Sequence, residues 1–169
     1  ADSEGDCSDD YIYYSNAAIS LKSNNIDLKK IPELKNYHVY AWQGANKVLG
    51  PQFAKSFPEV AEKKYTELPD SEKLPILLLL KRAEVLVLDK FIFEYMWHAL
   101  SQEYGVMPEV TYHELFNPRT YYCVKFKDPS FMNEFNVELG RFKKEGGIRD
   151  IYRTYMPNIS DKDLQWFLP

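Results

Sequence analysis

Residues 77–89 read LLLLKRAEVLVLD, and the segment EVLVL at 84–88 is the strongest strand signal in the chain. Its continuous apolar character predicts a strand buried on both faces of a parallel sheet. Asp89 ends this strand, and the residues after it predict a helix over 90–104, before Gly105. A buried strand followed directly by a helix is typical of an α/β fold.

A second strand, turn and helix lie earlier in the chain. Residues 38–42 (HVYAW) predict a short apolar strand, which runs into Gln43-Gly44-Ala45-Asn46, and helical spacing follows over residues 47–57. This order makes half of a βαβ unit. The other predicted elements are strands at 11–21, 110–112 and 121–126, a strand-like connector centred on Tyr65, and helices at 31–35, 72–82, 129–142 and 148–156.

Composition bounds the class of protein. The 169 residues are 45% hydrophobic and 15% aromatic, enough for a core. Twenty-one basic and twenty-five acidic residues give a net charge of −4, which argues against a nucleic-acid partner. The longest apolar run, residues 74–80, is too short to cross a bilayer, so we expect a soluble chain. Cys7 and Cys123 could form a disulfide in an oxidising compartment or remain two thiols.

Two places satisfy a rule for ligand binding in open α/β sheets, where ligands lie outside the carboxyl ends of parallel strands. At Gln43-Gly44-Ala45-Asn46, a tight glycine turn would present backbone N–H groups to a carboxylate or phosphate. The alternative is a turn that serves packing alone. Asp89 follows a buried strand and could pair with a ligand ammonium, or simply cap the next helix.

Enzymatic and metal chemistry have no positive support in the sequence. His38, His98 and His113 lack metal-ligand spacing, and neither cysteine has a neighbouring histidine. No nucleotide-binding or nucleophile motif is present, so we expect no cofactor, no metal and no catalytic residues. The tyrosines could line a sugar or amino-acid pocket, but on strands they more often pack.

Three stretches resemble the bacterial solute-binding family that serves polar amino-acid ABC transporters. They are IDLKKIPELKNYHVYAWQGA at 26–45, LLLLKRAEVLVLD at 77–89 and YYCVKFKDPSFMNEFNVELGRFKKEGGIRDIYRTYM at 121–156. The last is the most specific, with five positions in register: Asn136, Leu139, Gly146, Ile151 and Tyr155. The resemblance covers roughly residues 11–156.

The resemblance implies a type II periplasmic binding fold, an α/β fold of two lobes joined by hinge strands at 11–21 and 121–126. Residues 1–22 and 118–169 would then belong to an incomplete first lobe, and residues 23–117 would form the second lobe. The family's turn for the ligand carboxylate maps to Gly44, Ala45 and Asn46, and its ammonium-binding acid to Asp89. Gln43 and Tyr14 complete the predicted ligand-binding set.

The chain also departs from the family. Ala45 stands where the family has threonine, which removes a hydroxyl contact, and Asn46 is a candidate replacement donor. Most of the first lobe, with the arginine that clamps the ligand carboxylate, does not precede residue 11. We therefore expect a fragment, a cleaved product or a second chain that completes the lobe. Apolar side chains on the C-terminal helices would be left uncovered, which predicts an oligomer.

The resemblance implies a periplasmic or otherwise extracytoplasmic receptor that delivers a small polar solute to a membrane permease. One alternative is a sensing module that acts with a signalling partner. Another is a dehydratase-like enzyme with Asp89 and Glu94 as its only nearby carboxylates. A last alternative is a fragment that binds nothing.

Overall fold

The structure is a computed structural model that describes residues 5–58, 64–156, 159 and 164. The chain divides into two compact units. Unit 1 is formed by the residues up to 13 and from 120 onward, and unit 2 by residues 14–119. Each unit is described by itself.

Unit 2 is built on a five-stranded sheet with β6 at its centre. The strand order is β5 (Tyr65–Leu68), β4 (Val39–Trp42), β6 (Val85–Asp89), β3 (Asn16–Leu21) and β7 (Val110–His113). β4 runs parallel to both of its neighbours, whereas β3 runs antiparallel to β6 and to β7. The sheet is therefore mixed, rather than wholly parallel as EVLVL suggested.

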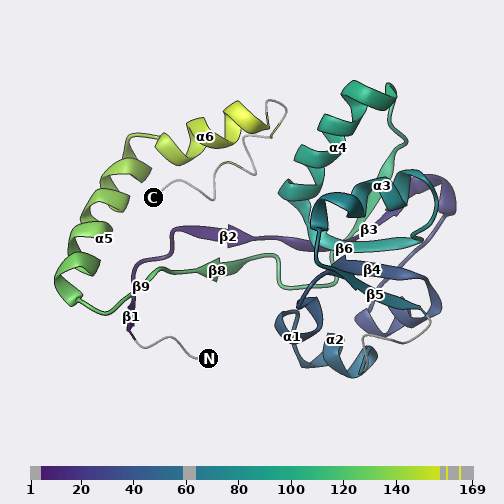
Figure 1. The fold of residues 1–169 in the computed structure, drawn as a ribbon, viewed down its shortest axis with the longest axis horizontal. Coiled ribbons are helices and arrows are strands. Elements are labelled where there is room, and N and C mark those ends of the chain that lie inside the picture. The colour runs from purple at the N-terminus through teal and green to yellow at the C-terminus, as the bar shows by residue number, and fades with distance from the viewer. Residues whose placement is uncertain (1–4, 59–63, 157–158, 160–163, 165–169) are drawn as a thin grey trace. The chain divides into compact units, whose positions relative to one another are not determined.

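Helices cover both faces of this sheet (Figure 1). Val85 and Val87 of β6 belong to one core cluster, and Leu86 and Leu88 to the other. The first face carries η2 (Ile31–Asn36), α1 (Ala45–Val48) and α2 (Pro51–Ser56); the second carries α3 (Leu74–Leu79) and α4 (Lys90–Tyr104). All five residues of β6 are buried, which confirms the prediction of a strand covered on both faces.

Two predicted helices are shorter than their sequence spacing indicated. The helix expected at 47–57 is divided into α1 and α2, because Gly50 takes a φ of 93° and Pro51 starts a new helix. The helix expected at 72–82 becomes η3 (Ser71–Lys73) and α3, which ends before Lys81 at a φ of 55°. A left-handed residue cannot continue a right-handed helix.

The compact units divide the chain at other positions than the expected lobes, because unit 2 begins at residue 14 rather than 23. The predicted hinge strand at 11–21 is two strands, β2 (Ile12–Tyr14) and β3, and β3 lies inside the sheet of unit 2. Its small and apolar residues pair with β6 on one side and β7 on the other, which draws them into the core. η1 (Lys22–Asn24) follows directly.

The described residues of unit 1 form short strand pairs and the helices α5 (Pro129–Lys144) and α6 (Gly147–Tyr155). β1 (Asp6–Cys7) pairs with β9 (Lys125–Phe126), and β2 pairs with β8 (Thr120–Tyr122), so the strand expected at 121–126 is also divided. Asp128 caps α5 by accepting a hydrogen bond from the Ser130 N–H, with proline next to the cap as predicted.

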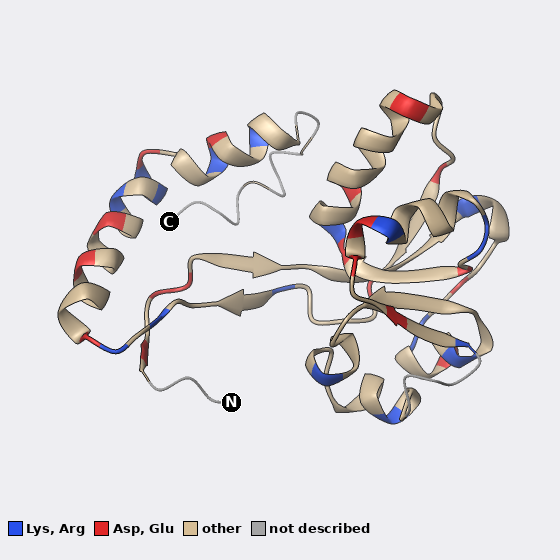
Figure 2. Ribbon diagram, viewed as in Figure 1, with Lys and Arg blue, Asp and Glu red and all other residues tan. Residues whose placement is uncertain are grey.

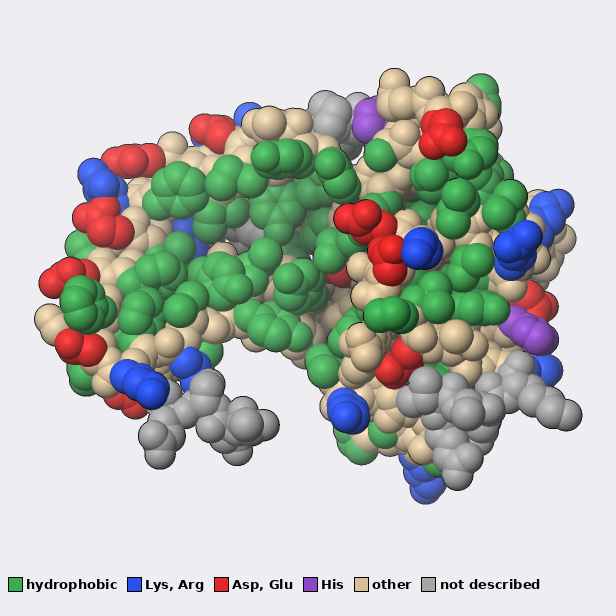
Figure 3. Space-filling view, viewed as in Figure 1, with side chains coloured by type: hydrophobic (Ala, Val, Ile, Leu, Met, Phe, Trp, Pro, Cys, Tyr) green, Lys and Arg blue, Asp and Glu red, His purple; other side chains and the backbone are tan. Residues whose placement is uncertain are grey.

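Unit 1 leaves many apolar side chains exposed. Phe131 on α5 is 63% exposed, and Val137, Phe142, Ile151 and Tyr155 are exposed as well. Figure 3 shows hydrophobic side chains gathered over this part of the chain, whereas Figure 2 shows both signs of charge along α5. None of the described helices has both the length and the apolar character that a membrane crossing needs. Self-association stays a prediction.

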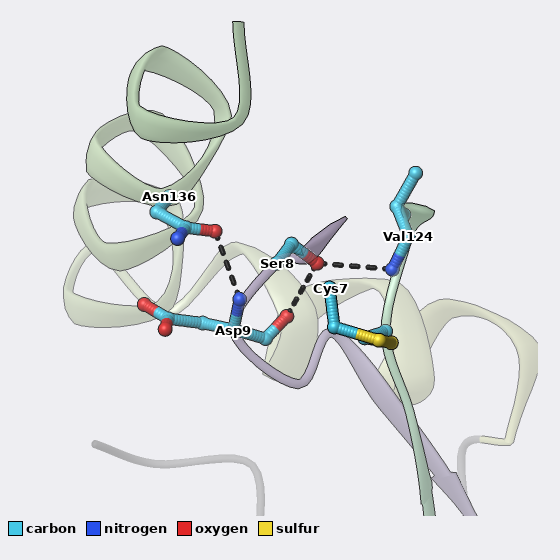
Figure 4. Close-up of a disulfide and its surroundings, with 6 residues drawn as sticks. Cys7, Ser8, Asp9, Val124 and Asn136 are labelled. Atoms are coloured by element: carbon cyan, nitrogen blue, oxygen red, sulfur yellow. Dashed lines mark hydrogen bonds between the residues drawn. A yellow bond between two sulfur atoms is a disulfide. The ribbon is translucent and has the colours of Figure 1, made fainter. Parts of the chain in front are cut away.

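A disulfide ties β1 to the segment that joins β8 to β9. Cys7 and Cys123 are joined, with their Cα atoms 5.5 Å apart and a separation of 116 positions in sequence. Around the bridge, Ser8 and Val124 exchange two hydrogen bonds, and the Asp9 N–H donates to the Asn136 side chain at 2.9 Å (Figure 4). The disulfide resolves the choice between a bridge and two thiols, and such bridges persist in oxidising compartments.

Reduction of this bridge should destabilise the chain. Because the bridge closes a long loop, breaking it should lower the free energy of unfolding by about 2–4 kcal/mol. Thermal unfolding with and without dithiothreitol measures this, and the double variant Cys7→Ser/Cys123→Ser is the control that should not respond to the reductant. An equal melting temperature for the oxidised and reduced wild type would contradict the prediction.

Candidate functional site

The predicted ligand-binding residues gather at one edge of the sheet in unit 2. The parallel strands β4 and β6 end there, at the Gln43–Asn46 turn and at Asp89. β3 starts at the same edge, where Asn16 lies opposite Asp89 in the antiparallel register, and Tyr14 lies two residues before it. This arrangement follows from strand order, because adjacent parallel strands present their carboxyl ends together.

The turn after β4 has the tight glycine geometry that the sequence predicted. Gly44 takes a φ of 90° and stands immediately before α1, whose four residues begin at the fully buried Ala45. Gln43 is exposed, whereas Gly44 and Asn46 are half-buried. Only glycine adopts this conformation without strain, so the turn depends on it.

The N–H groups of this turn are bound by a carboxylate of the chain itself. One Glu67 oxygen accepts the Gly44 N–H at 2.8 Å, and the other accepts the Asn46 N–H at 2.9 Å. The second oxygen also accepts the Tyr65 hydroxyl at 2.8 Å. Tyr65 and Glu67 are two residues apart on β5, so both side chains lie on the same face of the sheet.

These donors determine the charge of Glu67. Partial burial alone would raise its pKa, but the N–H groups of Asn46 and Gly44, the Tyr65 hydroxyl and nearby Lys47 together hold the pKa below its ordinary value. The carboxyl group is therefore ionised at neutral pH.

The Asn46 side chain also has a partner within unit 2. Its amide nitrogen donates a hydrogen bond to the backbone carbonyl of Phe57, just after α2. The bond ties the turn to the end of α2. The Asn46 amide, which the sequence suggested as a replacement donor to a ligand, thus already donates to the backbone in this structure.

Asp89 caps the helix that follows β6. One carboxylate oxygen accepts the Ile92 N–H at 2.9 Å, and the other accepts the Ser15 N–H at 2.6 Å. The Ser15 carbonyl in turn accepts the Lys90 N–H at 2.9 Å. Asp89 is only 4% exposed, so this capping contact holds the start of β3, the end of β6 and the start of α4 together.

The surroundings of Asp89 affect its ionisation and that of its neighbours. Burial raises the pKa of the Asp89 carboxyl above its ordinary value, although N–H groups from the helix start and from Ser15 oppose the rise. Glu94, one turn along α4, adds to it by repulsion. Glu94 accepts a hydrogen bond from the Tyr112 hydroxyl, and the Lys90 ammonium lies 5.5 Å from the centre of the Tyr112 ring.

His113 is buried and has hydrogen-bond partners within unit 2. It lies at the end of β7, with one ring nitrogen 3.0 Å from the Ser20 hydroxyl and the other accepting the Leu28 N–H at 3.4 Å. Burial lowers its pKa. Across the described ranges, no three histidine, cysteine, aspartate or glutamate side chains come close enough to hold a metal ion.

Comparison with known proteins found similar solved structures but no similar sequence family. No family model and no curated protein matches the sequence. Among solved structures, an ABC uptake transporter substrate-binding protein from Streptococcus pneumoniae with bound histidine matches 91% of this chain at a TM-score of 0.64 and 15% identity. An ancestral cationic amino acid solute-binding protein matches 90% of it at a TM-score of 0.60 and 19% identity. The chain has the type II periplasmic binding fold.

Other similar structures widen the range of ligands found among proteins with the type II periplasmic binding fold. The arginine-, lysine-, histidine-binding protein ArtJ from Geobacillus stearothermophilus matches 94% of the chain at a TM-score of 0.63 and 13% identity. EhuB in complex with hydroxyectoine matches 94% at a TM-score of 0.60 and 19% identity. This chain spans 62% of the Streptococcus pneumoniae protein, 62% of the ancestral protein, 65% of ArtJ and 60% of EhuB.

Sequence reasoning found the edge of the sheet but missed Glu67. A signal was present, because the buried Tyr65 two residues earlier on β5 places Glu67 on an inward face. A carboxylate in that position needs donors, and the nearest available ones are the N–H groups of the adjacent turn.

Loss of the Asp89 carboxylate should destabilise unit 2. Asp89→Ala removes a helix cap and leaves the Ser15 N–H without its acceptor, which together should cost about 2–4 kcal/mol in the free energy of unfolding. Urea unfolding measures the difference. The control is Asp70→Ala, which removes an exposed cap on η3 and should cost about 1 kcal/mol or less. Equal losses for the two variants would disprove the special role of Asp89.

Proposed function

We propose that this chain is the ligand-binding part of an extracytoplasmic receptor that binds a small polar solute for an ABC-type transporter. The observation that carries the proposal is the edge of the sheet in unit 2, where the glycine turn after β4 and the buried carboxylate after β6 lie on adjacent parallel strands. Such edges are where open α/β sheets bind ligands. The proposed contact residues are Tyr14, Gln43, Gly44, Ala45, Asn46 and Asp89.

Two further observations support this proposal. The described structural neighbours are named as binding proteins for arginine, lysine, histidine and other small polar molecules. The Cys7–Cys123 disulfide fits a compartment outside the cytoplasm. A membrane permease is the partner that this function requires.

We also propose that the site binds its solute without transforming it. The two carboxylates considered as a general acid and base have structural partners: Asp89 accepts backbone N–H groups on both oxygens, and Glu94 accepts the Tyr112 hydroxyl. A catalytic acid or base needs to reach the reacting atoms of a substrate. Each carboxylate would have to give up these structural partners to exchange a proton with a substrate.

A thermal-shift screen tests the receptor function. The 169-residue chain is screened against amino acids, small carboxylates, polyamines and sugars, and a true ligand should raise the melting temperature with dose. At one hundred times the dissociation constant the gain is about 2.7 kcal/mol. Gln43→Ala alters an exposed side chain at the turn and should reduce this shift with little effect on the chain alone.

The matched control is Gln52→Ala, which removes another exposed glutamine of unit 2, on α2. It should leave the ligand-dependent shift unchanged. A hit that Gln43→Ala and Gln52→Ala affect equally would move the binding site away from this edge. A panel in which no compound raises the melting temperature would count against the receptor function itself.

A further inference from the structure

The Glu67 carboxylate occupies the position at which the turn after β4 would hold an anion. Its two oxygens accept the Gly44 and Asn46 N–H groups at 2.8 and 2.9 Å. We propose that Glu67 is a specificity-determining residue that keeps a ligand carboxylate out of this turn, so that the solute presents an uncharged or cationic group there. The inference rests on the proposed receptor function and names its ligand class.

The contacts of Glu67 fix it firmly in this position. The Tyr65 hydroxyl donates to the same oxygen as the Asn46 N–H, and Tyr65 itself is 1% exposed. The Asn46 side chain is bonded to the Phe57 carbonyl, which holds the turn from the other side. Because Glu67 belongs to the neighbouring strand β5, it competes for these donors without the entropic cost that a free ligand carboxylate has to meet.

A ligand carboxylate would also meet an unfavourable charge at this turn. It would lie within a few ångströms of ionised Glu67, and like charges at that separation repel. Displacing Glu67 would deprive a partly buried carboxylate of three hydrogen-bond donors. Lys47 is the cation that acts on Glu67, and one lysine cannot neutralise both carboxylates.

Acidic side chains also lie beside the other strand end at this edge of the sheet. Asp89 ends the adjacent strand, and Glu94 is close enough to affect its ionisation. Lys90, the cation on that side, lies against the ring of Tyr112. Among the described residues, the carboxylates named at the two strand ends outnumber the lysines that act beside them, a balance that favours an amine, a guanidine or a neutral polar solute over an acid.

The test uses acetate as the smallest carboxylate probe and reads the backbone amides by nuclear magnetic resonance. The nitrogen-15-labelled 169-residue chain is titrated with sodium acetate against sodium chloride at constant ionic strength and neutral pH. In the wild type, the Gly44 and Asn46 amide signals should show no saturable shift. In Glu67→Ala, both signals should shift with saturation, at concentrations at least tenfold lower than any response of the wild type.

Two other variants keep the outcome clear. Glu67→Gln removes the charge with almost no change of shape and should respond to acetate in the same direction, so it serves if the alanine variant is poorly folded. Glu72→Gln removes one exposed carboxylate elsewhere in unit 2 and should behave as the wild type. A saturable shift in the wild type equal to that in the Glu67 variants overturns the proposal. So does no shift in either Glu67 variant, or a shift in Glu72→Gln.

A matched pair of solutes separates this inference from the receptor function. Agmatine and arginine differ by one carboxylate, as do cadaverine and lysine, and the wild type should bind the member without it more tightly. Arginine or lysine that binds the wild type and shifts the Gly44 and Asn46 amides would overturn the inference but leave the receptor function intact. Failure of all solutes to bind, with the acetate result as expected, would overturn the receptor function alone.

Discussion

The buried carboxylate of Asp89 holds together the edge of the sheet in unit 2 at which we propose the ligand site. It lies at the end of the central strand β6 and bonds backwards to Ser15 and forwards to Ile92. Burying a carboxylate costs free energy unless its oxygens accept hydrogen bonds. The start of β3, the end of β6 and the start of α4 therefore come together around Asp89, where backbone N–H groups supply those bonds. Because β4 and β6 are adjacent and parallel, the turn after β4 lies at the same edge of the sheet as Asp89. Fold and candidate site therefore depend on the same residue.

A second carboxylate gives this edge its chemical character. Glu67 satisfies the N–H groups of the glycine turn from the neighbouring strand, and those donors in return keep it ionised. A turn of this shape would be open to an anion if its donors faced solvent alone. Here the chain supplies the anion, and this is the basis of the proposed preference for an uncharged or cationic ligand group.

The sequence predicted the central features of the fold for local reasons. A continuous apolar run identified β6, and Asp89 and Asp128-Pro129 marked helix starts that the structure has. The features that the sequence did not predict depend on contacts between residues that are distant in sequence. β3 looked like a hinge because its pairing with both β6 and β7 cannot be read from residues 11–21 alone. The partnership of Glu67 with the turn was missed for the same reason, since about twenty residues separate them in sequence.

Hydrogen exchange of the full chain, with and without a solute that raises its melting temperature, tests the central claim most directly. If the solute binds at the edge of the sheet in unit 2, protection should increase in three segments: the backbone around Ser15, the turn at Gln43–Asn46 and the start of α4 after Asp89. Protection confined to α5 and α6, or spread evenly over the chain, would show that the solute binds elsewhere and would contradict the account.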